Sequence, residues 1–245
     1  MPVERAALRS SALLSALVLT TACLPGGGDD AGGDDAGGDQ SGSTSASTST
    51  TLSEGGRPLT EKQAEEALPS GDEVPGELVT GDEDVAEEDP NASSDPAVCR
   101  DVQLDGDAGQ FLDEETTIRV QRDYPGRDGG LVSVQITSHD SPVPDELFDD
   151  AGAAQSSCAE FTKTDHGETM TWKIIPASLE PMGDRTYVVG LRMLEGDEVF
   201  TGGQVRLAGV SIGHNLIYII YTAGPESRLR PEVVEDLARA TVDNL

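Results

Sequence analysis

The chain has 245 residues, of which 36% are hydrophobic and 25% are charged, and its formal net charge is −30 at pH 7. Such an excess of acidic side chains, without any cluster of Lys and Arg, excludes nucleic acid as a partner because it repels phosphate. It also argues against tight binding of the folded part to anionic lipid headgroups.

The first 22 residues have the layout of a secretory signal peptide. Arg5 and Arg9 give a positive start, and an apolar segment at 12–19 follows that is too short to span a bilayer. We therefore predict that residues 1–22 are a signal peptide and that the protein is exported.

Cys23 directly follows three small residues, and a cysteine at this place resembles the lipobox of bacterial lipoproteins. A lipobox usually carries leucine three residues before the cysteine, whereas here Thr20 holds that place and Leu19 lies one position further back. We expect Cys23 to be lipidated, so that the membrane is a partner through the N-terminal lipid and the protein lies on the outer face of the cell membrane. The alternative is an ordinary secreted protein in which Cys23 is removed or incidental.

The segment after Cys23 is of low complexity. Residues 26–40 repeat Gly, Asp and Ala, and residues 41–53 are nearly all Ser and Thr. With so little apolar surface to bury, residues 23–58 are predicted to form a disordered tether, followed by one folded domain at 59–245.

The domain is expected to open with a short helix. Thr60 and Gln63 have the spacing of a capping box, and Pro69 ends the helix. Residues 70–96 are acidic and rich in Gly and Pro, so we expect a long loop there with little regular structure.

The next elements are predicted from periodicity and turn residues. Two β-branched runs at 116–124 and 131–137 flank a Gly-rich turn and indicate a hairpin. A helix is expected over 141–161, capped by Ser141. Pro231 should begin a last helix. Further strands are expected near 169–176, 185–195, 199–207 and 210–222.

This order of elements indicates an α+β domain with a mainly antiparallel sheet of about six strands flanked by helices. The strand at 216–221 is apolar on both faces, so neither face is expected to be left to water. Either helices cover both of its faces, or one face lines an apolar cleft.

The chain has three cysteines. If Cys23 carries lipid, Cys99 and Cys158 remain as an even set in an exported, oxidising setting, and we predict a disulfide between them. The alternative is a pair of unpaired buried thiols. The cysteines have no Cys-x-x-Cys spacing, so neither zinc nor thioredoxin-type chemistry is supported.

Several short motifs resemble those of a family of actinobacterial exported domains, which includes the extracellular sensor domain of PknH-type serine/threonine kinases and many stand-alone lipoproteins. The motifs are Leu-Thr-Glu-Lys-Gln-Ala at 59–64, Ala-Leu-Pro at 67–69, Glu-Val-Pro at 73–75, Cys99, Cys158, Trp172 and Gly-His-Asn-Leu-Ile at 213–217. The resemblance implies an antiparallel sheet flanked by helices, with a groove for a ligand. The kinase domains typically hold two disulfides, whereas only one pair of cysteines is available here.

Motifs for catalysis or metal binding are weak. His139, His166 and His214 lack the spacing of a zinc helix or a nucleophile elbow, and we interpret them as solvated loop residues. The run at 105–109 resembles the start of a calcium loop, but Gln110 stands where glycine is required, so an acidic turn is the better interpretation. Neither a metal nor a cofactor is predicted.

Two functions remain. The first is a non-catalytic ligand-binding or sensing module of the cell envelope, whose ligand is an apolar or amphipathic small molecule or an envelope protein. Its predicted site lies at Tyr218 and Ile220, with Trp172 on a neighbouring strand, because aromatic side chains suit an apolar ligand. The alternative is an envelope hydrolase whose active site is assembled from residues distant in sequence.

Overall fold

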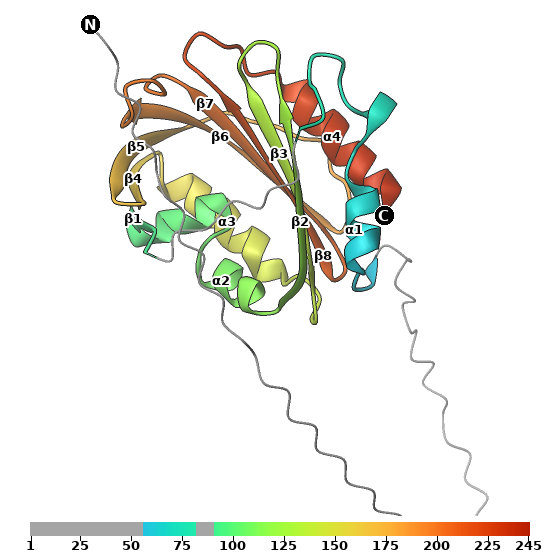
Figure 1. The fold of residues 1–245 in the computed structure, drawn as a ribbon. Helices are drawn as coiled ribbons and strands as arrows, with labels where there is room; N and C mark the ends of the chain where they lie inside the picture. Colours follow the sequence, from blue (N-terminus) through green and yellow to red (C-terminus); the bar gives the residue numbers. More distant parts are fainter. Residues whose placement is uncertain (1–55, 82–90) are drawn as a thin grey trace, which may run out of the picture. The chain divides into compact units, whose positions relative to one another are not determined.

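The structure is a computed structural model that describes residues 56–81 and 91–245 (Figure 1). The predicted signal peptide, Cys23 and most of the predicted tether lie outside the described residues. The helices are α1 (Glu61–Ala67), η2 (Gly71–Glu73), η3 (Ala97–Gln103), α2 (Asp107–Glu114), α3 (Asp145–Ser157) and α4 (Pro231–Asn244). The strands are β1 (Ser93–Asp95), β2 (Thr116–Pro125), β3 (Leu131–His139), β4 (Glu160–Asp165), β5 (Glu168–Ile175), β6 (Arg185–Glu195), β7 (Gln204–Ile212) and β8 (Asn215–Ala223).

The strands form one antiparallel sheet in the order β1-β4-β5-β6-β7-β8-β3-β2. The predicted α+β class is therefore confirmed, but the sheet has eight strands rather than about six. The two strands that the sequence did not reveal are β1, which has only three residues, and β4. β4 begins where the predicted helix was expected to end, and β1 lies in the stretch expected to be a loop.

Helices α1 and α4 cover one face of the sheet (Figure 1). The predicted capping box is present, because the Thr60 side chain accepts from the backbone of Gln63 and the Gln63 side chain accepts from the backbone of Thr60. Pro231 stands in the first turn of α4, as predicted. The apolar stripe of α4, centred on Leu237, is buried against the sheet. This layer, with the sheet residues beneath it, makes up the first hydrophobic core.

The other face of the sheet is covered by η3, α2 and α3, which enclose a second core. Helix α3 begins after Pro144 and not at the expected cap Ser141. Proline disfavours helical geometry in the residue before it, so Pro142 and Pro144 hold the approach to α3 extended. Helix α2 begins at Asp107, so the expectation of an acidic turn over 105–109 is wrong for residues 107–109, which are helical.

The turn between β7 and β8 lies at Gly213 and His214, five residues later than the predicted strand break at 208–209. Gly209 does not make a turn but lies inside β7, where a Cβ atom would come within 2.5 Å of Leu104 Cδ1. Glycine at this position therefore serves close packing between the strand and Leu104. Gly213 has φ +56° and takes the left-handed conformation that the true turn requires.

The described chain enters the domain along the β7–β8 turn. The backbone carbonyl of Gly56 accepts from the His214 amide at 3.1 Å, and the Asn215 side chain donates to the Arg57 carbonyl at 2.8 Å. Further along, the amides of Val79 and Gly81 donate to carbonyls of β2. The backbone from Val79 to Gly81 thus lies beside the outer end of this edge strand.

Candidate functional site

A disulfide joins Cys99 in η3 to Cys158 at the end of α3, with a Cα–Cα distance of 5.8 Å. This confirms the pairing predicted from the cysteine count. Both residues are buried in the second core. The bond therefore fixes η3 against α3, on the face of the sheet where a wide hollow lies.

That hollow is a groove of about 790 Å³ over strands β2, β3 and β8. Its floor is built from register pairs in which an apolar residue of β8 lies beside a polar residue of β3. The pairs are Leu216 with Thr137, Tyr218 with Gln135, and Ile220 with Ser133. The floor is therefore amphipathic, with one apolar and one polar strip running side by side.

The polar strip follows from the alternation of β3. Val134 and its apolar neighbours along this strand are fully buried beneath the α1 and α4 layer, so the residues between them face the groove. Gln135 donates to Gln121 of β2 at 3.3 Å, and Ser133 donates to Asp123 at 2.7 Å. These bonds hold the polar side chains in place. The site predicted from the sequence did not include Gln135 or Ser133. The alternation of polar and apolar residues along β3 could have indicated them.

The walls of the groove carry both charges. Arg100 of η3 forms a bidentate pair with Asp105, with a closest distance of 2.8 Å. On the β4 side, Lys163 pairs with Asp165 at 3.2 Å and donates to the Gln103 side chain at 3.0 Å. Each cation has its own carboxylate, so the rim offers paired charges and no strong preference for an ionic ligand.

Two residues of the predicted ligand site, Tyr218 and Ile220, line this groove and are half-buried. The Tyr218 hydroxyl donates to the Gln103 carbonyl at 2.9 Å, which connects the sheet to η3. Strand β8 thus has one face in the first core and the other along a groove. The role of Tyr218 and Ile220 in ligand binding stays a prediction.

Trp172 lies elsewhere. It is on β5, which β6 and β7 separate from β8, so the expectation of a neighbouring strand is wrong. Its side chain is 8% exposed and packs in the second core, beside Phe161 of β4 and Met193 of β6. Trp172 does not line the groove, and its apolar surface stabilises the sheet beneath η3 and α3. A single sequence could not give the strand order that separates it from Tyr218.

His139 lies at the end of the groove where α2 meets β3, and it is 1% exposed. The interpretation as a solvated loop residue is therefore wrong for this histidine. Its Nδ1 is 3.1 Å from the Leu112 carbonyl, and its Nε2 is 2.9 Å from the Thr137 hydroxyl. A carbonyl can only accept, so Nδ1 carries the proton and Nε2 accepts from Thr137. A neutral ring satisfies both contacts.

We expect His139 to make the domain less stable at mildly acidic pH. Burial lowers the pKa of His139 below its usual 6.5, so protonation is resisted in the folded state more than in the unfolded chain. The stability that the neutral ring contributes is present above about pH 6.5 and is lost as the pH falls below it.

The measurement is the urea concentration at the midpoint of unfolding. Between pH 7.5 and pH 5.5, this midpoint should fall more for the wild type than for His139→Gln. His166→Gln, at the exposed β4–β5 turn, is the matched control and should behave like the wild type. Equal pH dependence of the wild type and His139→Gln would contradict the assignment.

No family model and no curated protein sequence matches this chain. Among solved structures, the extracellular domain of PknH from Mycobacterium tuberculosis matches 78% of this chain and 98% of its own, with a TM-score of 0.57 and 12% sequence identity. The two chains share a fold. The resemblance inferred from the sequence motifs is thus confirmed at the level of the fold.

A protein described as a putative uncharacterized Rv0999 ortholog from Mycobacterium smegmatis matches 75% of this chain and 97% of its own, with a TM-score of 0.36 and 12% identity. Within residues 56–81 and 91–245, no helix has the length and apolar character required to cross a bilayer. In the same ranges, no three side chains of the metal-binding types come together.

Proposed function

We propose that this protein is a cell-surface lipoprotein whose folded domain is a non-catalytic ligand-binding or sensing module of the envelope. The observation that carries the binding function is the amphipathic floor of the groove, where the Tyr218 and Ile220 strip lies beside the Gln135 and Ser133 strip. A similar fold in an extracellular domain supports export. The signal-peptide layout and Cys23 support attachment through lipid.

The proposed occupant is a small amphipathic molecule. The volume of about 790 Å³ falls in the range of small-molecule sites, which extends from roughly 300 to 1,000 Å³. An apolar part would lie along Tyr218 and Ile220, and a polar, uncharged part would hydrogen-bond with Gln135 and Ser133. Both cations of the walls, Arg100 and Lys163, already pair with a carboxylate. An elongated, largely neutral molecule therefore fits better than a strongly charged one.

The hydrolase alternative lacks a comparable observation. The Thr137 hydroxyl and His139 Nε2 are 2.9 Å apart, as in a nucleophile and base pair. However, the exposed fractions of the two residues are only 4% and 1%, and the partners of Nδ1 are the Leu112 carbonyl and the Thr116 hydroxyl instead of a carboxylate. These contacts anchor β3 to α2, so we assign the pair a structural role.

We expect Ile220→Glu to weaken binding in the groove while the domain stays folded. Ile220 is half-buried at the surface of the groove, and a carboxylate there disrupts the apolar strip. The probe is Nile red, an uncharged fluorophore with an apolar body and polar ends, titrated into purified protein. Its affinity should fall about tenfold or more, a loss of roughly 1.4 kcal/mol. Native mass spectrometry of the wild type should also detect a co-purified small molecule that the variant lacks.

Val199→Glu is the matched control, since Val199 is 73% exposed in the loop between β6 and β7 and does not line the groove. It introduces the same charge and should bind the fluorophore like the wild type. Equal affinity of the wild type and Ile220→Glu would refute the groove as the site. Co-purification of a protein in place of a small molecule, lost in Ile220→Glu, would refute the small-molecule part of the proposal.

A further inference from the structure

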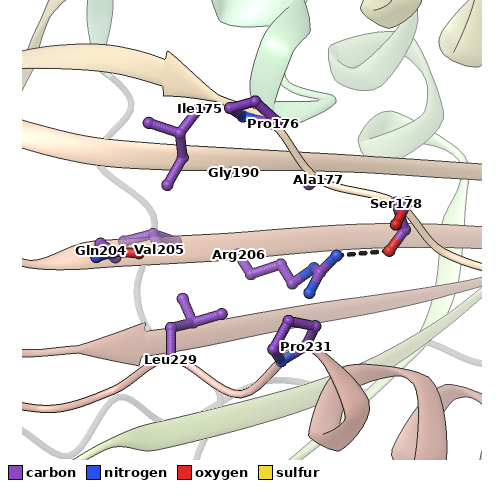
Figure 2. A pocket seen from close by; sticks show the side chains of 10 residues that line it. All are labelled: Ile175, Pro176, Ala177, Ser178, Gly190, Gln204, Val205, Arg206, Leu229 and Pro231. Carbon is purple, nitrogen blue, oxygen red and sulfur yellow. Dashed lines mark hydrogen bonds between the residues drawn. The ribbon is translucent and has the colours of Figure 1, made fainter.

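A second hollow, of about 380 Å³, lies on the opposite face of the sheet at the start of α4 (Figure 2). Its floor is a row across three strands formed by Ile175 of β5, Gly190 of β6 and Arg206 of β7. Along β7, Ala208 follows Arg206 on the same face and belongs to the first core. Arg206 therefore points away from the groove, and this hollow is separate from it.

Glycine at position 190 leaves the space beside Arg206 open. A Cβ atom at this position would approach Ile175 Cγ1 to 2.8 Å. Gly190 is paired in register with Arg206, so any larger residue would also crowd the arginine side chain from the neighbouring strand. The absence of a side chain thus permits close contact with Ile175 and keeps a hollow next to the guanidinium.

Arg206 is a buried cation, with an exposed fraction of 4%. Its one hydrogen bond among the described residues is from Nη2 to the Ser178 carbonyl, drawn as the dashed line in Figure 2. Its Nε is buried without a hydrogen-bond partner in the described part of the chain. By contrast, Arg230, one residue before α4, pairs with Glu77 at 2.8 Å.

A buried guanidinium without a carboxylate is costly, because burial removes its hydration and a neutral carbonyl restores only part of the lost stabilisation. Burial lowers the pKa of Arg206, and the nearby Glu235 and Glu232 partly oppose this effect. Arginine nevertheless remains charged at neutral pH. Neither glutamate lies within 4 Å of the guanidinium, and Glu235 already pairs with Arg239 at 2.9 Å. The counter-charge for Arg206 is therefore missing from residues 56–81 and 91–245.

The remaining walls are mainly apolar. Pro176, Leu229 and Pro231 line the hollow together with Ile175, and Ser178 and Gln204 add polar groups at its sides. Pro231 is also the first residue of α4, a helix of 14 residues. The positive end of its dipole lies on this side and favours a negative group there. A mainly apolar, open hollow thus contains a single buried positive charge.

We propose that this hollow is a second binding site, for a small molecule that carries one carboxylate on a short apolar body. The carboxylate pairs with the Arg206 guanidinium, whose planar fork matches two carboxylate oxygens and whose Nε lacks a partner. The apolar body packs against Leu229, Pro231 and Ile175. A monoanion is favoured over a dianion such as phosphate, because one cation is present and Glu232 and Glu235 lie near it.

The test uses purified full-length protein and hexanoate as the probe. Titration calorimetry should show saturable binding of hexanoate, at least about tenfold weaker binding of uncharged hexanamide, and at least about tenfold weaker binding of acetate, which lacks the body. In nitrogen-15 NMR spectra, the Nε–H signal that is absent from Arg206→Met should move as hexanoate is added. The calorimetric comparisons among hexanoate, hexanamide and acetate use the wild type alone and do not depend on the folding of any variant.

Arg206→Met should weaken hexanoate binding by about tenfold or more. Arg192→Met is its matched control, because Arg192 is an exposed arginine on β6 that pairs in register with Gln204 and does not line the hollow. It should bind hexanoate like the wild type. Equal binding of hexanamide and hexanoate, equal binding of phosphate and hexanoate, or an unmoved Arg206 signal would each overturn the proposal. The binding function proposed for the groove on the other face does not depend on any of these results.

Discussion

Replacing both Cys99 and Cys158 by alanine should lower the free energy of unfolding by about 4 kcal/mol, since the bond closes a loop with a sequence separation of 59 residues. The loss comes chiefly from the greater freedom of the unfolded chain. The double substitution should also lower the affinity of the groove for its ligand. The bond holds η3 to α3, and η3 supplies the Gln103 carbonyl to which the Tyr218 hydroxyl donates. Urea unfolding measures the first effect, and titration of the folded variant with Nile red measures the second.

The control for this variant is the wild type unfolded in the presence of a reductant, which breaks the same bond and leaves the side chains unchanged. Its unfolding midpoint should approach that of the double variant. The double substitution is preferred to a single one because it leaves no unpaired thiol at either position. An unfolding free energy within about 1 kcal/mol of the oxidised wild type would show that the bond contributes little, against the loop-entropy expectation.

Replacing Cys23 by serine should release the protein completely from the membrane fraction of cells. The proposed lipid on Cys23 is the only membrane attachment that we propose, and serine has no thiol to accept it. The acidic chain, with its net charge of −30, is repelled by anionic headgroups and should not stay attached without the lipid. Cell fractionation followed by immunoblotting measures the distribution, and metabolic labelling with a fatty acid should label only the wild type.

Ala22→Ser is the control, because it changes the residue next to the proposed cleavage point to another small residue and keeps the thiol. It should remain in the membrane fraction and carry the label. Retention of Cys23→Ser in the membrane fraction, at the level of the wild type, would mean that the lipid anchor is wrong. The ordinary secreted protein considered as the alternative would be found in the soluble fraction for both variants.

The sequence predicted well those elements whose signals are local. The capping box at Thr60, the start of α4 at Pro231 and the hairpin between β2 and β3 each depend on a few adjacent residues, and all three are present. Errors arose where distant contacts decide the outcome. A break between two strands was expected at 208–209, but Gly209 lies inside β7, where it packs closely against Leu104. Strand β4 forms because β1 and β5 pair with it, and a periodic pattern does not show these partners.

The candidate site was predicted in part for the same reason. Tyr218 and Ile220 were identified because their strand is apolar on both faces, and they line the groove. Trp172 was placed beside them only through an assumed strand order. Arg206 gave no signal at all, because an isolated arginine in a strand looks like a solvated residue until the burial of its side chain and the position of its possible partners are known.

The backbone from Val79 to Gly81 has a consequence for how copies of this protein meet each other. The sheet is open, so β2 presents a backbone edge onto which a strand of another molecule could add. The amides of Val79 and Gly81 already occupy the carbonyls of Pro125 and Asp123, and the bulge near Thr116 distorts the other end of β2. The opposite edge strand, β1, has only three residues. Neither edge therefore presents a long regular template, and the sheet is protected against the strand-by-strand stacking that begins aggregation.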